Sequence, residues 1–248
     1  MQKKISVTWI LFLLVYSSYA QVSLESVPVG TFQTGAWVIY ASNTVDLNKR
    51  IPYERIGGSP FWKSEYQLAT IIDLKNHVLG KAPAKLNLYT NELYFLSSNG
   101  EERVAAPGTV RKVVFHNGRD TISEIAAVFE NYLPSIAESN PHAKNPSYVQ
   151  ILNNGNVQLL KHVRKMFLSG DSLFRTMKRY YFSDQVNYYL NNKYGQNTRL
   201  RKLSRESILE TLRIVAADEE WIKKNSIDFK KEEDVIRFLN YYNSRKKG

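Results

Sequence analysis

Positive charge is the chemical feature that this sequence concentrates in one stretch. Residues 161–205 contain 11 lysine and arginine residues but only two acidic residues, Asp171 and Asp184. Residues 21–160 carry 12 basic and 12 acidic residues, and residues 206–248 carry nine of each, so both flanks are balanced. Such a local excess predicts one basic surface for an anionic partner. The residues expected to form it are Lys161, Arg164, Lys165, Lys178, Arg179, Arg201 and Lys202.

Two interpretations of this segment stay open. As a binding surface it fits lipid head groups or acidic polysaccharide. Residues 178–181 also interleave cations with aromatic rings, as single-strand nucleic-acid binders do, but an exported protein seldom meets nucleic acid. In the second interpretation, the same cations have a structural role and lie on the solvent-exposed faces and protected edges of hairpins. Along a strand, Lys161 and Lys165 share one face and Arg164 shares the other with His162.

No catalytic motif is visible in the chain. The histidines His77, His116, His142 and His162 include no pair at i, i+4 spacing, and none lies in an HExxH motif. The adjacent carboxylates at 101–102 fall in an expected turn, where solvation is their usual state. The chain has no cysteine, which excludes disulfides, thiolate metal sites and a cysteine nucleophile. We therefore expect no metal and no cofactor, and we favour a binding protein over an enzyme.

The first 20 residues predict an export signal. Two lysines precede a 12-residue apolar segment at 5–16, and Ser18-Tyr19-Ala20 has the small-x-small pattern of a cleavage site. This run is shorter than the roughly 20 residues of a membrane span, so we expect cleavage between Ala20 and Gln21. The mature chain has no apolar stretch of membrane length, and its lack of cysteine excludes a lipoprotein. We expect a bacterial periplasmic protein, or one that is secreted or associated with the outer membrane.

The middle of the chain predicts short antiparallel strands. Residues 66–74, 84–89, 92–96 and 110–115 are rich in β-branched and aromatic side chains. Asn-Gly pairs at 99–100 and 117–118 favour hairpins, because both residue types tolerate positive φ. Residues 125–132 predict a strand or a helical turn. The strongest hairpin signal is 153–156, and a last hairpin is expected at 177–190 with its turn at Ser183 and Asp184.

The pattern changes to helical at Ser204. Ser204 and Asp218 are N-cap candidates followed by acidic residues, and the last apolar stripe recurs at helical spacing from Val235 to Tyr242. The predicted fold class is α+β: an antiparallel β-rich region (sandwich, meander or barrel-like) followed by a small helical segment. The expected divisions are the signal at 1–20, a weakly structured segment at 21–60, a β-rich domain at 61–203, and helices at 204–248. The helical segment has too little core to fold alone, so it should pack on the β-rich domain.

Scattered motifs resemble those of uncharacterised exported proteins of Bacteroidetes-type bacteria, a family of unknown function. The resemblance covers most of the mature chain and implies export and the strand-then-helix order, with no activity to carry over. Its motifs are Gly58-Ser59-Pro60-Phe61, a strand ending in Asp73, Leu86-Asn87-Leu88-Tyr89, Asn91-Glu92-Leu93-Tyr94, Ser204-Arg205-Glu206-Ser207-Ile208-Leu209 and Phe229-Lys230-Lys231-Glu232-Glu233-Asp234-Val235-Ile236.

The leading hypothesis from these features is an exported, non-enzymatic scaffold or binding protein of the bacterial envelope, whose segment 161–205 contacts an anionic component. Two alternatives remain. One is a secreted hydrolase acting on glycans or peptides, with carboxylates brought together by the fold. The other is a small-ligand carrier built as a closed antiparallel barrel.

Overall fold

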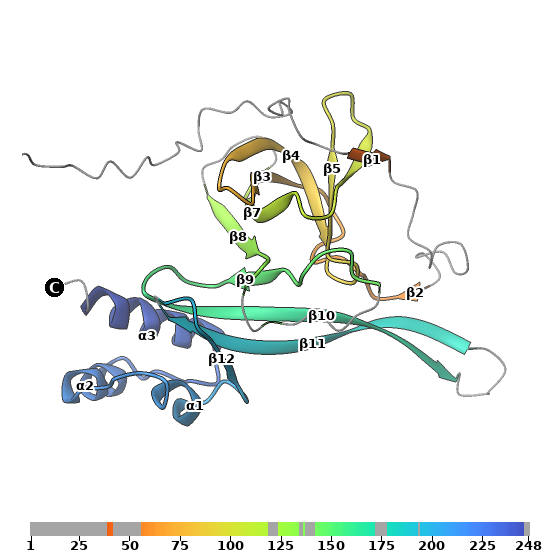
Figure 1. Cartoon of the computed structure of the whole chain (residues 1–248). Coiled ribbons are helices and arrows are strands. Elements are labelled where there is room, and N and C mark those ends of the chain that lie inside the picture. The colour runs from red at the N-terminus through yellow and green to blue at the C-terminus, as the bar shows by residue number, and fades with distance from the viewer. Residues whose placement is uncertain are drawn as a thin grey trace, which may run out of the picture.

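A computed structural model describes residues 39–41, 56–118, 124–133, 136, 142–171, 178–192 and 194–245. Of residues 39–41, 171 and 178, only the backbone is described. Strands make up 46% of the described residues, and helices follow them at the C-terminal end (Figure 1), which confirms the predicted β-rich region and terminal helices. The predicted signal at 1–20 and its cleavage site lie outside the described residues. Within the described ranges, no helix is long and apolar enough to cross a bilayer.

The described strands form one mixed sheet of 12. Its path is β1-β6-β5-β4-β3-β7-β8-β9-β10-β11-β12 with antiparallel neighbours, while β2 pairs with β11 in parallel. The path is open, because β1 and β12 stand at its two ends. The strands are β1 (Ile39–Ala41), β2 (Ile56–Gly57), β3 (Gln67–Asp73), β4 (Val78–Asn87), β5 (Glu92–Leu96), β6 (Glu102–Ala105), β7 (Val110–His116), β8 (Ile125–Glu130), β9 (Val149–Ile151), β10 (Val157–Asp171), β11 (Lys178–Asn192) and β12 (Asn197–Leu200).

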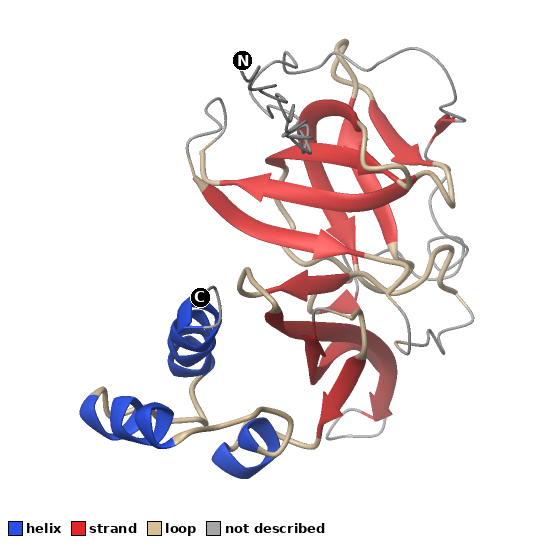
Figure 2. Cartoon of the chain, turned by 60° about the vertical axis from the view of Figure 1, so that its left-hand side comes forward, coloured by secondary structure: helices blue, strands red, loops and turns tan. Residues whose placement is uncertain are grey.

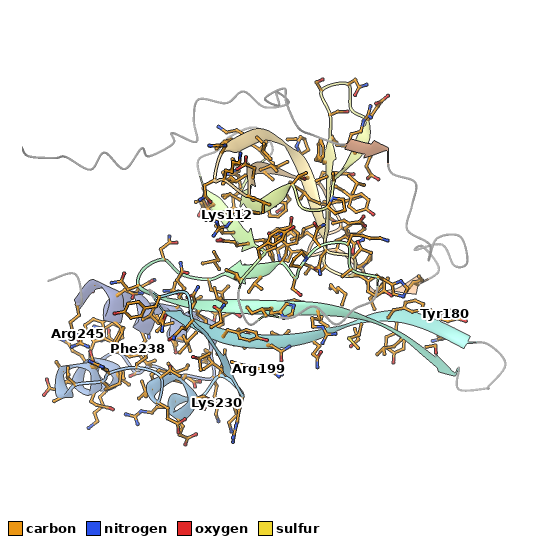
Figure 3. The ribbon with its side chains drawn as sticks, in the orientation of Figure 1. Lys112, Tyr180, Arg199, Lys230, Phe238 and Arg245 are labelled. Atoms are coloured by element: carbon orange, nitrogen blue, oxygen red, sulfur yellow. The ribbon has the colours of Figure 1, made fainter. Side chains whose placement is uncertain are left out.

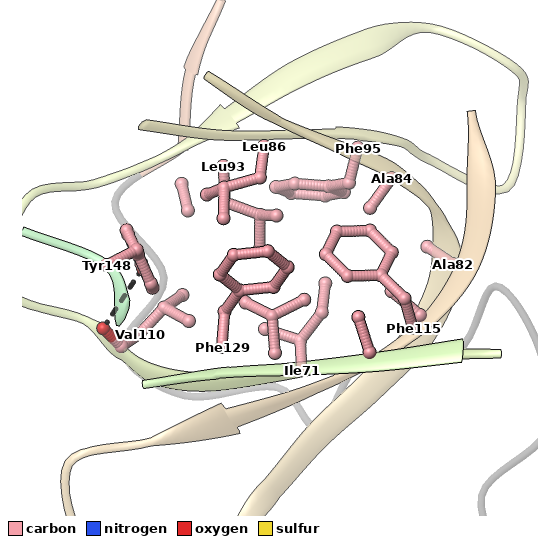
Figure 4. Close-up of a cluster of buried hydrophobic side chains, with 14 of the residues drawn as sticks. Ile71, Ala82, Ala84, Leu86, Leu93, Phe95, Val110, Phe115, Phe129 and Tyr148 are labelled. Carbon is pink, nitrogen blue, oxygen red and sulfur yellow. Dashed lines mark hydrogen bonds between the residues drawn. The ribbon is translucent and has the colours of Figure 1, made fainter. Parts of the chain in front are cut away.

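Strands β3, β4, β5, β7 and β8 curl around a shared apolar interior (Figure 4). Alternate residues of each strand point inward, as the period of two in a strand requires. Phe115 and Phe129 meet edge to face with ring centroids 6.0 Å apart, and Trp62 packs on both rings. Fully burying one such side chain contributes about 1.5–3 kcal/mol, so this interior is a principal source of stability for the curled part.

Short local signals placed three hairpins correctly. The turn at 97–100 joins β5 to β6, and Gly100 adopts a φ of +79° there. Strands β7 and β8 pair across residues 117–124, and the segment at 125–130 is a strand. The predicted turn at 153–156 joins β9 to β10, with Gly155 at a φ of +125°. Each turn uses residue types that accept left-handed backbone, which is why local sequence predicted them.

The last predicted hairpin was wrong in its turn position. Strand β11 runs unbroken from Lys178 to Asn192, so Ser183 and Asp184 lie in mid-strand. They stand opposite Met166 and Lys165 of the equally long β10. Fifteen residues of each strand pair without a register shift, and this continuous ladder outweighs the weak local turn preference. The connection between the two strands falls at 172–177, outside the described residues.

Three helices follow β12 in the described chain and pack against the base of this long hairpin (Figure 2). They are α1 (Arg205–Leu209), α2 (Ala216–Lys224) and α3 (Glu232–Arg245). Their buried apolar residues, including Phe238 and Leu239, join Leu159 of β10 and Leu190 of β11 in one cluster. The burial of this shared cluster explains why the helices lie on the hairpin.

The two predicted helix caps had different outcomes. Ser204 is the N-cap of α1, and its hydroxyl accepts a hydrogen bond from the Ser207 amide at 3.3 Å. Asp218 was wrong as an N-cap, because α2 begins two residues earlier with Val215 as its cap. The Asp218 carboxylate instead accepts from the Val215 amide at 2.9 Å and pairs with Arg245 at 2.9 Å. Its side chain therefore fixes the start of α2 to the end of α3.

Aromatic rings dock the outer part of the long hairpin on the curled strands. Phe167 of β10 stacks on Tyr180 with centroids 5.6 Å apart, and Phe182 meets Tyr89 at 5.3 Å. One face of the hairpin carries Phe167, Tyr180 and Phe182. Phe167 stands directly opposite Phe182, and Tyr180 precedes Phe182 by two residues on the same strand. We call this the docked face: the odd-numbered residues of β10 and the even-numbered residues of β11. The remaining residues of the two strands form the opposite face.

Candidate functional site

Lys161 and Lys165 of the basic segment lie on the docked face, and both form ion pairs. The Lys161 Nζ is 2.8 Å from Glu232 Oε2 of α3. The Lys165 Nζ is 2.7 Å from Asp184 Oδ1, directly across the hairpin. Lys178 is the first residue of β11, and only its backbone is described. These contacts favour a structural role for Lys161 and Lys165 over contact with a partner.

Glu232 joins three elements through a half-buried network. Its Oε2 accepts a hydrogen bond from the Tyr188 hydroxyl at 2.7 Å as well as the ion pair from Lys161. Burial, together with this hydrogen bond and the Glu232 charge, raises the pKa of the Tyr188 hydroxyl well above its usual value. The Tyr188 hydroxyl therefore stays protonated and donates a hydrogen bond to the carboxylate. The network fixes the start of α3 to both long strands.

The arginines of the long hairpin lie on the opposite face. Arg164 Nη1 donates to the side-chain oxygen of Gln185 at 3.3 Å, and Arg179 is exposed. Arg164 and His162 share this face, as the strand period predicts, and His162 is buried. The segment's charges are thus divided between two faces and do not form one patch on the hairpin.

Arg201 and Lys202, by contrast, line a groove between β12 and α1. Leu200 is buried in the helix-packing cluster, while Arg201 and Lys202 after it are exposed. The Ser207 hydroxyl donates to the Lys202 carbonyl at 2.8 Å, which holds this turn against α1. The groove has a volume of about 600 Å³, and its lining residues are Thr198, Arg199, Arg201, Lys202, Ser204, Glu206, Ser207, Glu210 and Thr211.

A second hollow of about 390 Å³ continues this groove toward the start of α3. The two share Lys202, Ser204 and Glu206, so they form one surface, which we call the C-terminal groove. Arg205 and Lys230 line the second part, and Figure 3 shows Arg199 and Lys230 at the two parts of the groove. Five cations from three chain segments therefore line it: Arg199, Arg201, Lys202, Arg205 and Lys230.

Most of these cations form no ion pair among the described residues, although Glu206, Glu210 and Asp228 also line the groove. Within the described part of the chain, Arg201, Lys202 and Lys230 form no ion pair. Arg199 donates to the neutral side-chain oxygen of Asn187 at 2.7 Å, whereas Arg205 pairs with Glu219. An exposed cation whose contact is a neutral amide keeps its full attraction for an anion. The groove can therefore bind anionic groups, and its hydroxyls and carboxylates can bind polar neighbours of those groups.

The histidines serve the fold or lie at the surface. His116 is buried and contacts the Thr70 hydroxyl at 2.9 Å, and burial lowers its pKa, with Lys81 nearby adding to the effect. His77 is exposed beside Asp73 in a turn. His142 stacks on Tyr89, with ring centroids 5.5 Å apart. The described residues contain no cluster of three or more histidines and carboxylates that could hold a metal.

The adjacent carboxylates at 101–102 form contacts within the curled sheet. Glu101 is exposed, and hydrogen bonds from Asn99 and Arg103 lower its pKa. Glu102 accepts a hydrogen bond from Tyr66 and lies 2.9 Å from Lys85 Nζ. Both carboxylates thus hold neighbouring strands and turns together.

Sequence reasoning missed three of the cations in the groove. Arg199 and Arg205 lie inside the basic segment but were not singled out, and Lys230 lies outside it. No local signal links Lys230 to Lys202, because only the packing of the helices on the hairpin brings them into one hollow. Arg201 and Lys202, which the sequence assigned to a basic surface, both line this groove.

Comparison of the chain with protein-family models, with curated proteins and with solved structures gives no match.

Proposed function

We propose that this protein is an exported, non-enzymatic binding protein of the bacterial envelope, and that its C-terminal groove holds an acidic polysaccharide. The observation that carries this proposal is the convergence of Arg199, Arg201, Lys202, Arg205 and Lys230 on one groove. Surface cations that form no ion pair attract anions, and several together raise both affinity and encounter rate.

The other groups of the groove favour a polysaccharide over a simple anion. Glu206 and Glu210 would repel a bare phosphate, but their oxygens accept hydrogen bonds from sugar hydroxyls. The hydroxyls of Thr198 and Ser204 add further polar contacts. A ligand that alternates charged groups with hydroxyls matches this mixture. Uronate-containing chains have that chemistry, so we take them as the ligand class.

Export is supported by sequence. The apolar run at 5–16 and the Ser18-Tyr19-Ala20 site favour cleavage before Gln21, and the resemblance to exported Bacteroidetes-type proteins implies the same. We place the mature chain in the periplasm, or secreted or associated with the outer membrane. Mass spectrometry of the mature protein should find Gln21 at its N-terminus, and recovery of intact Met1 from the membrane fraction would contradict export by cleavage.

The two alternative functions have less support. Glycoside hydrolases hold their general acid in apolar surroundings, whereas Glu206 and Glu210 of the groove are both exposed. A carrier with a closed sheet would need its end strands to pair, but β1 and β12 stand at opposite ends of an open path. Binding at the groove therefore remains the function that the geometry favours.

Substitution of the three cations without ion pairs tests this proposal. In the variant Arg201→Gln, Lys202→Gln, Lys230→Gln, we expect affinity for an oligogalacturonate to fall by roughly 10- to 30-fold. This is the effect of removing three exposed charge contacts worth about 0.5–0.7 kcal/mol each. The matched control Lys75→Gln, Lys223→Gln, Lys224→Gln removes the same charge from exposed sites outside the groove.

Isothermal titration at low and at physiological ionic strength measures both effects. We expect the groove variant to bind more weakly and the control variant to stay within a few fold of the parent. Binding should also weaken with salt, because screening shortens the range of exposed charges to about 8 Å at physiological ionic strength. Equal losses in both variants, or no binding by the parent, would reject the groove as the site.

A further inference from the structure

The register of β10 and β11 sorts their charges by face. The docked face carries charges of both signs, namely Asp184, Lys161 and Lys165. The opposite face carries Arg164 and Arg179, and no acidic residue of either strand falls on it. Because residues directly opposite each other in an antiparallel pair share a face, this separation follows from the pairing itself.

The outer half of the opposite face also exposes apolar side chains between its arginines. Met166 is 37% exposed and Tyr181 is 41% exposed, and Leu168 lies opposite Tyr181. Arg164 precedes Met166 by two residues on β10, and Arg179 precedes Tyr181 by two on β11, so the cations flank the apolar group. The inner half differs, since Leu160 and Tyr189 are buried there with Ile136.

The outer half of the opposite face points away from the curled strands. Phe167 and Phe182 occupy the docked face against Tyr89. Because successive side chains of a strand alternate between its faces, the residues next to them on each strand, such as Met166 and Tyr181, point to the other side. Figure 1 shows the outer end of β10 and β11 extending past the curled strands. The outer part of the long hairpin therefore presents an exposed tyrosine and methionine beside a half-buried leucine, with an arginine on either side.

We propose that this surface, formed by Arg164, Met166, Leu168, Arg179 and Tyr181, binds an anionic lipid bilayer. Tyrosine favours the level of the lipid head groups, with its ring in the apolar zone and its hydroxyl in water. Arginine side chains beside it attract anionic head groups. The absence of acidic residues from this face of the two strands makes the charge complementary to such a bilayer. This site is separate from the C-terminal groove and does not depend on it.

Vesicle binding by paired variants tests the assignment of faces. In the variant Arg164→Gln, Arg179→Gln, we expect partitioning to phosphatidylglycerol-containing vesicles at low salt to fall about 30-fold, at roughly fivefold per basic residue. Arg164→Gln alone should fall about fivefold. Lys165→Gln removes the same charge from the neighbouring position, but on the docked face, and should stay within about twofold of the parent.

A single label gives a second, independent measurement. The chain has no cysteine, so Met166→Cys and Val186→Cys each create one site for an environment-sensitive fluorophore. The two positions are similarly exposed, at 37% and 43%, but lie on opposite sides of the hairpin. Added anionic vesicles should shift the emission of the label at 166 to the blue and leave the label at 186 unchanged.

The outcomes separate this inference from the groove. Loss of vesicle binding in the arginine variant with oligogalacturonate binding intact supports a lipid-binding hairpin. Loss of vesicle binding in the variant lacking Arg201, Lys202 and Lys230, with the hairpin variants unaffected, would assign lipid binding to the groove and overturn the inference. Equal effects of Arg164→Gln and Lys165→Gln, equal shifts of both labels, or no binding of the parent to anionic vesicles would overturn it as well.

Discussion

Asn243 of α3 is the side chain whose removal should most clearly loosen the helices from the hairpin. It is 6% exposed and lies against the turn between β9 and β10. Its Nδ2 donates to the carbonyls of Asn154 at 3.2 Å and Val157 at 2.8 Å, and its Oδ1 accepts from the Val157 amide at 2.9 Å. One side chain thus satisfies three backbone groups that no strand or helix pairs.

The structure sets the size of the effect of Asn243→Ala. Three hydrogen bonds at about 1 kcal/mol each give a loss of about 3 kcal/mol. Alanine is the better helix former, which returns roughly 0.5 kcal/mol. The Val157 carbonyl keeps a second bond from Asn153 Nδ2 at 3.0 Å, which reduces the loss further. We therefore expect the free energy of unfolding to fall by about 2 kcal/mol.

Urea unfolding followed by circular dichroism measures this change. Asn240→Ala is the matched control, because Asn240 is an exposed asparagine on the same helix and should be neutral or slightly stabilised. Asn243→Asp keeps the acceptor for the Val157 amide but sets a carboxylate against two carbonyls, so it should destabilise at least as much as alanine. If Asn243→Ala destabilised no more than Asn240→Ala, the turn would not depend on this clamp.

Three further predictions concern other contacts. Gly155→Ala should lower the free energy of unfolding by more than about 1 kcal/mol, because Gly155 has a φ of +125° and an added Cβ would lie 2.5 Å from Asn243 Nδ2. Thermal unfolding measures this change, and an unchanged midpoint would contradict the prediction. The lowered pKa of His116 means that the unfolded chain binds its proton first, so stability should fall as the pH drops below about 6.5, while His116→Gln should show a flatter profile between pH 7 and 5. A profile as steep as that of the parent would exclude His116 as the cause. Lys85→Met should cost about 2 kcal/mol in urea unfolding, because the Lys85 ammonium lies 4.6–5.5 Å from three ring centroids and 2.9 Å from the Glu102 carboxylate; a loss below about 0.5 kcal/mol would mean that these contacts do not contribute.

The local sequence correctly predicted the turns that depend on the backbone preferences of their own residues. The hairpins at 97–100 and 153–156 were found because asparagine and glycine accept the left-handed backbone that such turns need. The turn expected at Ser183 and Asp184 failed because a weak local preference competes there with a ladder of 15 paired residues. The outcome depends on the length of β10, which cannot be inferred from the local sequence at 177–190.

In the candidate sites, likewise, local sequence was enough to assign residues to strand faces but not to identify contacts that the tertiary fold creates. The strand period alone is enough to place Arg164 and Lys165 on different faces. The partner of Lys161 could not be predicted, since Glu232 lies far along the chain and reaches it only when α3 packs on the hairpin. Lys230 enters the groove for the same reason. Charge counting thus located the basic segment, while the pairing and convergence of its charges required the tertiary fold.

Hydrogen exchange of the mature protein with and without an oligogalacturonate is the decisive test of the groove as the binding site, because it locates binding without altering the chain. We expect slower amide exchange at 198–211 and 227–230, the segments that form the C-terminal groove, with 161–171 and 178–187 unchanged. Protection confined to the long hairpin or the curled strands, or no protection at saturating ligand, would contradict a polysaccharide site in the groove.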